Sequence, residues 1–413
     1  MKDSSLGRPL RIALVTTFYP PFSFGGDGIY VQRLARALAA RGHHVEVVHD
    51  TDAYRHLSGK SPEVQDEDDG IIVHRLGSKH PLLSSLGVQQ LGQPTTHRKE
   101  LERLLTDRFD VIHFHNISLI GGPGIWKIGT GIKLHTAHEH WLVCPSHILW
   151  RDNRELCDEK RCLRCVLRHG RPPQLWRATD LIAREAHHVD AFLMLSQSAA
   201  KNHRRFGFKS PTTVVPSFLP DVPSLPETSS PPERGFFLFV GRLEVIKGLQ
   251  DVIPAFDESI PADLLIAGDG DYEAELRKLA EGRKNVRFLG RLQENELREL
   301  YRDAIAVITP SRCYEVFPLV VLEAFRESTP IIARNLGPYP EIVEETGGGL
   351  LFDTAETLHA CLKDLSENPD KVKSLGQKAK IGLDRNWKED VALNAYFDLI
   401  YTIRAQKTVS SNL

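Results

Sequence analysis

The sequence predicts an α/β protein built from two Rossmann-like domains that face a cleft. Three observations predict it. The chain has 413 residues, which is more than one ordinary domain needs. Its first half opens with a strand, a glycine loop, a helix and a second strand, and this alternation continues. The alternation starts again at residue 236, after a stretch rich in Pro and Ser, 216–235, that we interpret as an interdomain linker.

In the first half, strands are expected in short apolar runs and helices where apolar residues recur every three to four positions. The expected strands are 10–16, 44–48, 71–75, 110–115, 132–135, 191–196 and 213–215. The expected helices are 29–40, 99–106 and one that starts at residue 197. We assign residues 1–218 to this N-terminal domain and expect a C-terminal helix, 388–413, to cross back and pack on it.

The second half repeats the architecture without repeating the sequence, and we assign residues 234–387 to it. Its expected strands are 236–240, 263–267, 286–289, 305–309 and 330–333. Its expected helices are 249–256, 272–281, 294–302 and 319–326. Ligands of such sheets bind at the carboxyl ends of the strands, so the chemistry is expected at strand ends that face the cleft.

The composition narrows the class of protein. Hydrophobic residues make up 41% of the chain and charged residues 26%, which is typical of a soluble globular protein. A formal net charge of -2 gives no support for bulk nucleic-acid binding. No apolar run has the length of a membrane helix, and the polar N-terminus lacks the apolar core of a signal peptide. A cytoplasmic location is therefore expected.

The carboxylates Glu315 and Glu323 carry the strongest chemical signal. Between them lie the end of a loop and the start of a predicted helix whose first turn fits Pro318. A helix N-terminus offers free backbone N–H groups and a partial positive charge, which suit a diphosphate. Because a carboxylate can accept two hydrogen bonds from vicinal hydroxyls, Glu315 is expected to bind a sugar and Glu323 a ribose.

Cations and glycines follow two other predicted strands. Arg242 and Lys247 come after strand 236–240, where two cations can neutralise a diphosphate that gains charge as the donor bond breaks. Gly25 and Gly26 follow the first strand, where a glycine loop lets the backbone approach a phosphate or sugar closely. Taken singly, these residues also fit surface salt bridges and a tight turn.

Together these segments resemble a known family. Residues 315–330, EVFPLVVLEAFRESTP, resemble the E-x7-E motif of retaining GT-B glycosyltransferases of family 4, whose usual form is E-x-F-G-L-x-x-x-E-A-x-A-x-G-x-P. Pro318 and Ser328 replace the two glycines, and Pro318 removes one N–H near the expected phosphate. Residues 239–248, FVGRLEVIKG, are similar to the family's G-R-x-x-x-x-K-G segment, and the resemblance covers nearly the whole chain.

The resemblance implies a GT-B fold and transfer of a hexose from a UDP- or GDP-sugar to a glycan or lipid-linked acceptor, with retention. The implied setting is cell-surface polysaccharide or glycoconjugate assembly. It implies no divalent metal for catalysis, because Arg242, Lys247 and a helix end stabilise the leaving diphosphate. It also implies that this phosphate assists deprotonation of the acceptor, so that no enzyme nucleophile is needed. Further residues are implied to lie against the donor: Gly268, Leu292, Phe317 and Leu319.

The segment 135–145, HTAHEHWLVCP, resembles an H-D-Y-W-L-L-C-P-like stretch in one branch of the family. The resemblance makes His138 the histidine near the reacting sugar, with Glu139 in place of the usual Asp. An imidazole there can hydrogen-bond the donor sugar or handle an acceptor proton. His113 and His115 end an earlier predicted strand, and for these two we favour packing at the strand end.

An insertion at 144–171 contains four of the six cysteines: Cys144, Cys157, Cys162 and Cys165. Four thiolates, two of them in a C-x-x-C pair, fit a structural zinc site, and an iron–sulfur cluster would use the same ligands. Reduced cysteines without a metal are the alternative. The insertion is also rich in arginine, which favours contact with anionic lipid or a lipid-linked pyrophosphate at the inner face of the membrane, unless its own acidic neighbours neutralise it.

Two other functions fit some of these residues. The basic pair and the two glutamates are compatible with a GT-B-fold epimerase that acts on a nucleotide sugar without an acceptor, although the F-x-L-x-x-x-E-A context argues against it. A non-catalytic nucleotide-sugar-binding homologue, with Pro318 as the mark of decay, is the third hypothesis. We rank it last because every expected charged donor residue is present.

Overall fold

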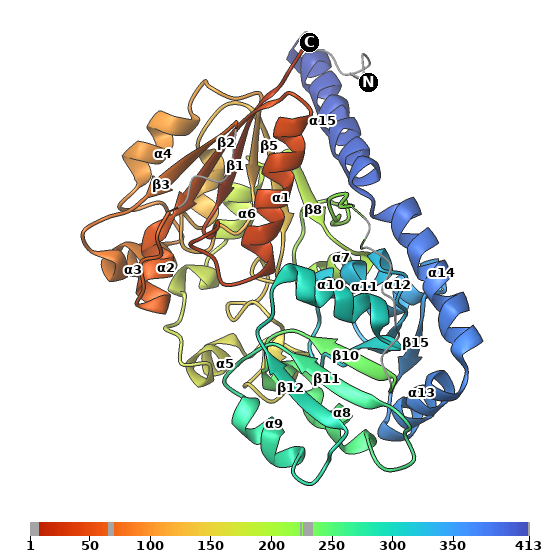
Figure 1. Ribbon diagram of the computed structural model, residues 1–413. Coiled ribbons are helices and arrows are strands. Elements are labelled where there is room, and N and C mark those ends of the chain that lie inside the picture. The colour runs from red at the N-terminus through yellow and green to blue at the C-terminus, as the bar shows by residue number, and fades with distance from the viewer. Residues whose placement is uncertain (1–7, 65–69, 224, 226–233, 412–413) are drawn as a thin grey trace.

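The computed structural model describes residues 8–64, 70–223, 225 and 234–411, and it contains two parallel sheets, one above the other in Figure 1. The first sheet has seven strands in the order β3–β2–β1–β4–β5–β8–β9, and every pairing is parallel. Its strands are β1 (Arg11–Thr16), β2 (His44–Asp50), β3 (Ile71–Leu76), β4 (Val111–Phe114), β5 (Ile132–Ala137), β8 (Ala191–Met194) and β9 (Thr212–Val214).

Helices cover both faces of this sheet because its strands are apolar on both sides. Along β1, Ala13 and Val15 belong to one buried cluster, while Ile12 and Leu14 belong to the other. The helices of this half include α1 (Gly26–Ala40), α2 (Thr51–Ser58), α3 (Pro81–Leu91), α4 (Arg98–Leu105), α6 (Leu181–Ala186) and α7 (Gln197–Arg205). Of these, α2, α3 and α6 were not predicted.

The second sheet has six strands in the order β12–β11–β10–β13–β14–β15, again all parallel. Its strands are β10 (Phe236–Val240), β11 (Asp263–Ala267), β12 (Val286–Gly290), β13 (Ala306–Thr309), β14 (Ile331–Arg334) and β15 (Gly349–Phe352). Phe237 and Phe239 of β10 face one buried cluster, and Phe236 and Leu238 face the other. The prediction of two Rossmann-like sheets in one α/β chain is confirmed.

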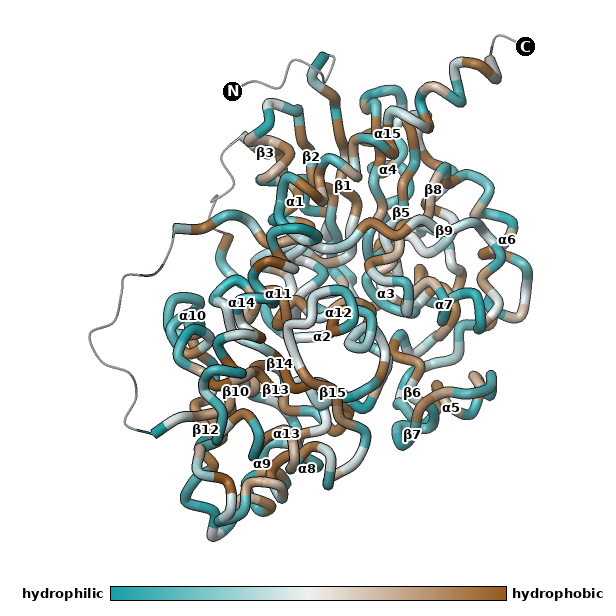
Figure 2. Tube along the Cα trace, turned by 90° about the vertical axis from the view of Figure 1, so that its right-hand side faces the viewer, coloured by the Kyte–Doolittle hydropathy of each residue, from teal (hydrophilic) through white to brown (hydrophobic). Residues whose placement is uncertain are grey.

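The second sheet is also covered on both faces. Its helices are α8 (Leu249–Val252), α9 (Glu273–Leu279), α10 (Glu294–Asp303), α11 (Leu319–Arg326), α12 (Tyr339–Thr346), α13 (Ala355–Glu367) and α14 (Pro369–Asn386). In Figure 2 the brown, apolar parts of the trace concentrate along strands such as β10, β13 and β14, with the polar helices outside them.

The C-terminal helix α15 (Glu389–Ser411) continues from α14 and lies along the first sheet (Figure 1). Its residues Tyr396 and Phe397 pack in the same buried cluster as Ile12 of β1. The hydroxyl of Tyr396 lies 3.2 Å from Nδ1 of His113 on β4. The last helix therefore links the two halves. Of the proposed linker 216–235, residue 224 and residues 226–233 lie outside the described residues.

A helix that crosses a bilayer must be both long enough and apolar enough. Within the described ranges, no helix of the chain satisfies both requirements for crossing a membrane.

Candidate functional site

A partly buried charged pair lies where β10 and β13 end. Lys247 closes a short 3₁₀ helix (Val245–Lys247) after β10, and Glu315 lies in the loop that leads from β13 to α11. Nζ of Lys247 is 2.7 Å from Oε1 of Glu315, and Ser311 Oγ donates to the same oxygen at 2.7 Å. Burial opposes both charges, but their mutual attraction outweighs it, so the pKa of Glu315 is lowered and the pKa of Lys247 is raised. The pair is therefore ionised at neutral pH.

Two glycines shape the backbone beside this pair. Gly248 has a φ of +78°, and a Cβ there would lie 2.1 Å from the carbonyl oxygen of Pro310. Gly268 has a φ of +138°, and a Cβ there would lie 1.9 Å from the carbonyl oxygen of Gly241. A side chain at either position would displace the backbone at the ends of β10 and β13. Gly268, predicted to bind the donor, thus has a structural role as well.

Arg242, the second predicted cation, points to solvent. Its side chain is 64% exposed, and its guanidinium pairs with Glu244. Glu244 also acts electrostatically on Lys247, so this acid acts on both predicted cations. Sequence reasoning did not identify Glu244, although it lies inside the motif that contains both cations. The exposed guanidinium of Arg242 is free to turn toward a ligand.

Glu323 lies just over one turn into α11 and joins the two halves of the molecule. Tyr301 of α10, in the same half, donates a hydrogen bond of 3.0 Å to Oε2 of Glu323. Arg33 of α1, in the other half, lies 3.5 Å from Oε1. Arg33 was not predicted because 290 positions separate it from Glu323 and nothing in its local sequence marks it.

The glycine loop of the first half faces the start of α11. Pro318 is the N-cap of α11, one residue before the first-turn position expected for it. Gly26 begins α1, with Gly25 as its N-cap in an extended conformation. A Cβ added to Gly26 would lie 3.5 Å from Cδ1 of Leu319. The two predicted phosphate-binding elements therefore meet across the cleft.

Three predicted donor contacts have packing roles. The ring of Phe317 lies 5.8 Å from that of Trp387 and packs against buried clusters of both halves. Leu292 and Leu319 are partly buried against the cluster of the second half. Contact of these three side chains with a donor stays a prediction.

His138 lies beyond the end of β5, supported by two aromatic neighbours. Its Nε2 is 2.9 Å from Nδ1 of His115, and its ring lies 4.9 Å from that of Tyr30. Burial lowers the pKa of His138 to about 4, with Glu139 opposing the shift, so the imidazole is neutral at pH 7. His113 and His115 are both buried, as expected for packing residues, but His115 also holds the ring of His138.

Sequence reasoning missed an acid on the same side of the cleft. Asp27, in the first turn of α1, accepts a hydrogen bond of 3.0 Å from Nδ2 of Asn116. Burial raises the pKa of Asp27, and the charge of Glu139 adds to the effect. Glu139 itself pairs with Nδ1 of His147 at 2.6 Å. The sequence feature that could have identified Asp27 is its position directly after Gly25 and Gly26.

The four clustered cysteines line one small cavity with Pro145, Ser146, Trp150 and three charged residues. Most of the arginines in their segment are paired with acids of the same segment. Arg151 contacts Glu155 at 2.8 Å, and Arg168 contacts Asp152 at 3.2 Å. The local acids therefore offset much of the basic charge that favoured an anionic partner.

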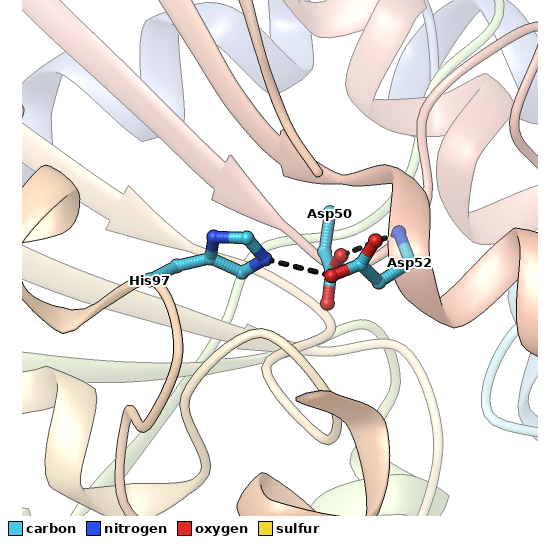
Figure 3. Close-up of side chains that lie close together, drawn as sticks. All are labelled: Asp50, Asp52 and His97. Atoms are coloured by element: carbon cyan, nitrogen blue, oxygen red, sulfur yellow. Dashed lines mark hydrogen bonds and ion pairs between the residues drawn. The ribbon is translucent and has the colours of Figure 1, made fainter. Parts of the chain in front are cut away.

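Figure 3 shows a cluster of buried ionisable side chains, Asp50, Asp52 and His97, near the end of β2. Asp50 Oδ1 accepts from the backbone N–H of Asp52 at 2.7 Å and so caps α2. Asp52 accepts from the N–H of Ser78 at 2.8 Å and lies 3.0 Å from Nε2 of His97. Burial raises the pKa of Asp50 to about 8. These bonds join α2 to the segments before α3 and α4, which is a structural role.

Comparison with known proteins identifies the family in both halves. Residues 24–220 match the family model described as Glycosyltransferase Family 4, and residues 224–381 match the model described as Glycosyl transferases group 1. A glycogen synthase of Mycobacterium tuberculosis is 27% identical over 417 residues, which cover 92% of each chain.

Solved structures share the architecture. Sucrose-phosphate synthase from Thermosynechococcus elongatus superposes with a TM-score of 0.68 at 21% identity, covering 96% of this chain and 100% of that chain. Anabaena HepE in complex with UDP-glucose superposes with a TM-score of 0.62 at 15% identity, covering 97% and 100%. The chain therefore belongs to the family 4, group 1 glycosyltransferases, and it is a glycosyltransferase with the GT-B fold.

Proposed function

We propose that this glycosyltransferase moves a hexose from a nucleotide sugar to a glycan or lipid-linked acceptor with retention of the anomeric configuration. The proposed setting is assembly of a cell-surface polysaccharide or glycoconjugate. The observation that carries the proposal is the ionised pair of Lys247 and Glu315 at the carboxyl ends of β10 and β13. The pair belongs to the same half as α11, and the start of α11 faces the glycine loop at Gly26 of the other half.

In the proposed donor complex, Lys247 neutralises charge on the leaving diphosphate. Glu315 accepts from hydroxyls of the hexose. Its Oε1 bonds Lys247 and Ser311, whereas no described residue bonds its Oε2, which leaves that oxygen for the sugar. Arg242 turns from Glu244 toward the diphosphate. This division puts the cations on the phosphates and the carboxylate on the sugar.

The remaining donor contacts come from α11. Because Pro318 has no N–H, the free N–H groups of this helix start at Leu319, and we assign them to the phosphate. Glu323 accepts from the ribose hydroxyls with the oxygens that now contact Tyr301 and Arg33. UDP is the nucleotide that we favour, because a solved structure of the same fold holds UDP-glucose.

On the acceptor side, His138 bonds His115 through Nε2, and no described residue bonds its Nδ1. We assign Nδ1 to a hydroxyl of the donor sugar or of the acceptor. The leaving phosphate takes the acceptor proton as the new bond forms on the same face of the sugar. Lys247, Arg242 and the start of α11 supply the positive charge that a divalent metal supplies in other glycosyltransferases, so the proposed reaction uses no catalytic metal.

The acceptor would determine where in the cell the reaction takes place. A lipid-linked acceptor would bring the enzyme to the inner face of the membrane, on the cytoplasmic side. Arg154 and Arg171 are arginines of the cysteine-rich segment for which no ion pair with a described residue is found, and they would meet the acceptor's phosphate. Nucleic acid is not a proposed partner, since the net charge is -2.

A thermal-shift screen of nucleotide sugars tests the donor assignment. A ligand at 100 times its Kd stabilises the folded chain by about 2.7 kcal/mol, which such a screen detects readily. UDP-hexoses are expected to raise the Tm of the wild type more than UDP alone does. Glu315→Gln should retain the shift caused by UDP and lose the extra shift caused by the hexose, whereas Lys247→Ala should lose both.

Turnover experiments then separate the competing functions. With the stabilising donor and a matched acceptor, NMR of the product is expected to show the anomeric configuration of the donor. Epimer formed from the donor alone would support an epimerase instead. Stabilisation by a donor without product from any acceptor, glycan or lipid-linked, would support a non-catalytic binding protein.

A further inference from the structure

We infer that Cys144, Cys157, Cys162 and Cys165 bind one structural zinc ion, in a site distinct from the donor residues. All four cysteines are free, and all four line a single cavity of about 20 Å³. The segment that carries them adds only a two-stranded hairpin and one short helix to the fold. In Figure 2 these elements, β6 (Trp150–Arg151), β7 (Glu155–Leu156) and α5 (Cys162–Arg168), lie beside the two large sheets.

Three separate pieces of backbone bring the thiols together. Cys144 ends a turn in which its N–H bonds the carbonyl of His140 at 2.8 Å. Cys157 follows β7, and its N–H bonds the carbonyl of Leu149 at 2.8 Å. Cys162 and Cys165 start α5, where a spacing of three residues places both side chains on one face of the helix. Four thiols from a turn, a hairpin and a helix N-terminus match the ligand sets of structural zinc sites.

The surroundings of a partly buried arginine, Arg177, are a second observation that bears on this site. The guanidinium of Arg177 stacks on Trp141 and Trp176, at 5.0 and 4.7 Å from their ring centroids. Its hydrogen bonds go to the neutral groups of Gln174 and the Trp141 carbonyl, and it makes no ion pair with any carboxylate among the described residues.

Two of the thiols lie close enough to act on this cation. Arg177 interacts electrostatically with Cys144 and Cys162, and also with Glu139. A zinc ion bound by four thiolates carries a net charge of about -2, which would place further negative charge beside this cation. The backbone N–H of Asp152 already donates to Sγ of Cys165 at 3.3 Å, as second-sphere groups do at metal-bound thiolates.

The size of the cavity favours a single ion over a cluster. A cavity of about 20 Å³ has room for one ion or one water molecule, whereas an iron–sulfur cluster contains several iron and sulfide atoms. The four sulfur atoms lie farther apart than the ligand atoms of Asp50, Asp52 and His97 in Figure 3, which all lie within 4.8 Å of one another. Zinc binding, with Zn–S bonds of about 2.3 Å, draws the sulfurs inward.

The zinc ion would stabilise a segment that has little secondary structure of its own. Among the described residues, its two hairpin strands pair only with each other. A segment with so little secondary structure gains stability from a metal or disulfide. His147 joins it to the main domain, through the 2.6 Å pair with Glu139 and a bond from the N–H of His140 to the His147 carbonyl. Zinc would thereby hold the position of Glu139, next to His138.

Metal analysis of the full chain, purified without chelators, tests the inference. We expect one zinc per chain in the wild type and in Cys361→Ser, which changes a cysteine of α13 far from the cavity. Cys157→Ser and Cys162→Ser should each lose most of the zinc. Because loss of a zinc ligand can also unfold these variants, the wild type is titrated with a mercurial reagent, which should release one zinc as the thiols react.

A second measurement on the wild type identifies the atoms that bind the metal. Chain folded with Co²⁺ in place of zinc should show the strong visible absorption of a tetrahedral thiolate site. Metal-free protein in which all six cysteines react as thiols would overturn the inference. So would two disulfides, with only Cys313 and Cys361 left to react. Iron with acid-labile sulfide would overturn it in favour of a cluster.

Discussion

Removal of the Lys247 cation is the most informative perturbation of the donor site. Lys247→Ala leaves Glu315 with a single hydrogen-bond donor, Ser311, and removes the charge assigned to the leaving diphosphate. The variant is expected to lower both the free energy of unfolding and the rate of transfer. The two effects have different physical sources, so they are measured separately.

The stability effect follows from the 2.7 Å separation of Nζ and Oε1. Two unit charges at that distance attract by about 6 kcal/mol at an effective dielectric constant of 20 and by about 1.5 kcal/mol in bulk water. The side chains are 26% and 20% exposed, and desolvation offsets part of the attraction. We therefore expect a coupling free energy of about 1–3 kcal/mol between Lys247 and Glu315.

A double-mutant cycle with Lys247→Ala, Glu315→Gln and the double variant measures this coupling by urea unfolding. The matched control is Lys363→Ala, which breaks an exposed pair with Glu367 at 4.0 Å and should cost less than about 1 kcal/mol. If the two single effects add to within about 0.5 kcal/mol, Lys247 and Glu315 are not coupled, which contradicts the expected attraction.

The same variants test catalysis. Loss of one charge that stabilises a leaving group costs about 2.7–4 kcal/mol, so Lys247→Ala should lower kcat and kcat/KM by about 10²–10³-fold. The Lys363→Ala control should transfer sugar at the wild-type rate. If kcat of Lys247→Ala stays within about threefold of the wild type, Lys247 does not stabilise the transition state.

Three further outcomes are expected. Because the folded state raises the pKa of Asp50 to about 8, only the unfolded chain releases this proton as the pH rises from about 4 to about 8, so this group's contribution to stability falls over that window. Asp50→Asn should remove this pH dependence of the free energy of unfolding, measured by urea unfolding at several pH values. A variant with the same pH dependence as the wild type would contradict the expectation. Gly248→Ala, with its φ of +78° and a Cβ 2.1 Å from the Pro310 carbonyl oxygen, should lower the unfolding free energy by more than about 2 kcal/mol, whereas Gly282→Ala, with the same φ and nothing near its Cβ, should cost less. Arg33→Ala removes the 3.5 Å contact with Glu323 and should change the KM for the donor by roughly fivefold or about 1 kcal/mol, with kcat much less affected; an unchanged KM would remove Arg33 from the donor site.

Much of the fold could be predicted because local periodicity reports it. The strands of both sheets are short, β-branched or aromatic runs, and their positions agree with the prediction to within a few residues, β15 excepted. Helix α14 was missed for a physical reason. Its buried face includes Gly376, Ala379 and Gly382, which allow close packing but add little to a hydrophobic pattern. A Cβ on Gly376 would lie 2.0 Å from the carbonyl oxygen of Ser328.

The sequence by itself determined the α/β class, the two-sheet organisation and the series of charged residues at the ends of β10 and β13. These follow from neighbours along the chain, because strand and helix periodicity and the spacing of Lys247 and Glu315 in their motifs are local properties. Only the tertiary structure decided the contacts between distant segments. Arg33 meets Glu323, and His115 meets His138, because parallel strands and crossing helices set which faces come together. Four cysteines surround one cavity for the same reason: three short pieces of backbone converge there, and no spacing along the chain encodes that convergence.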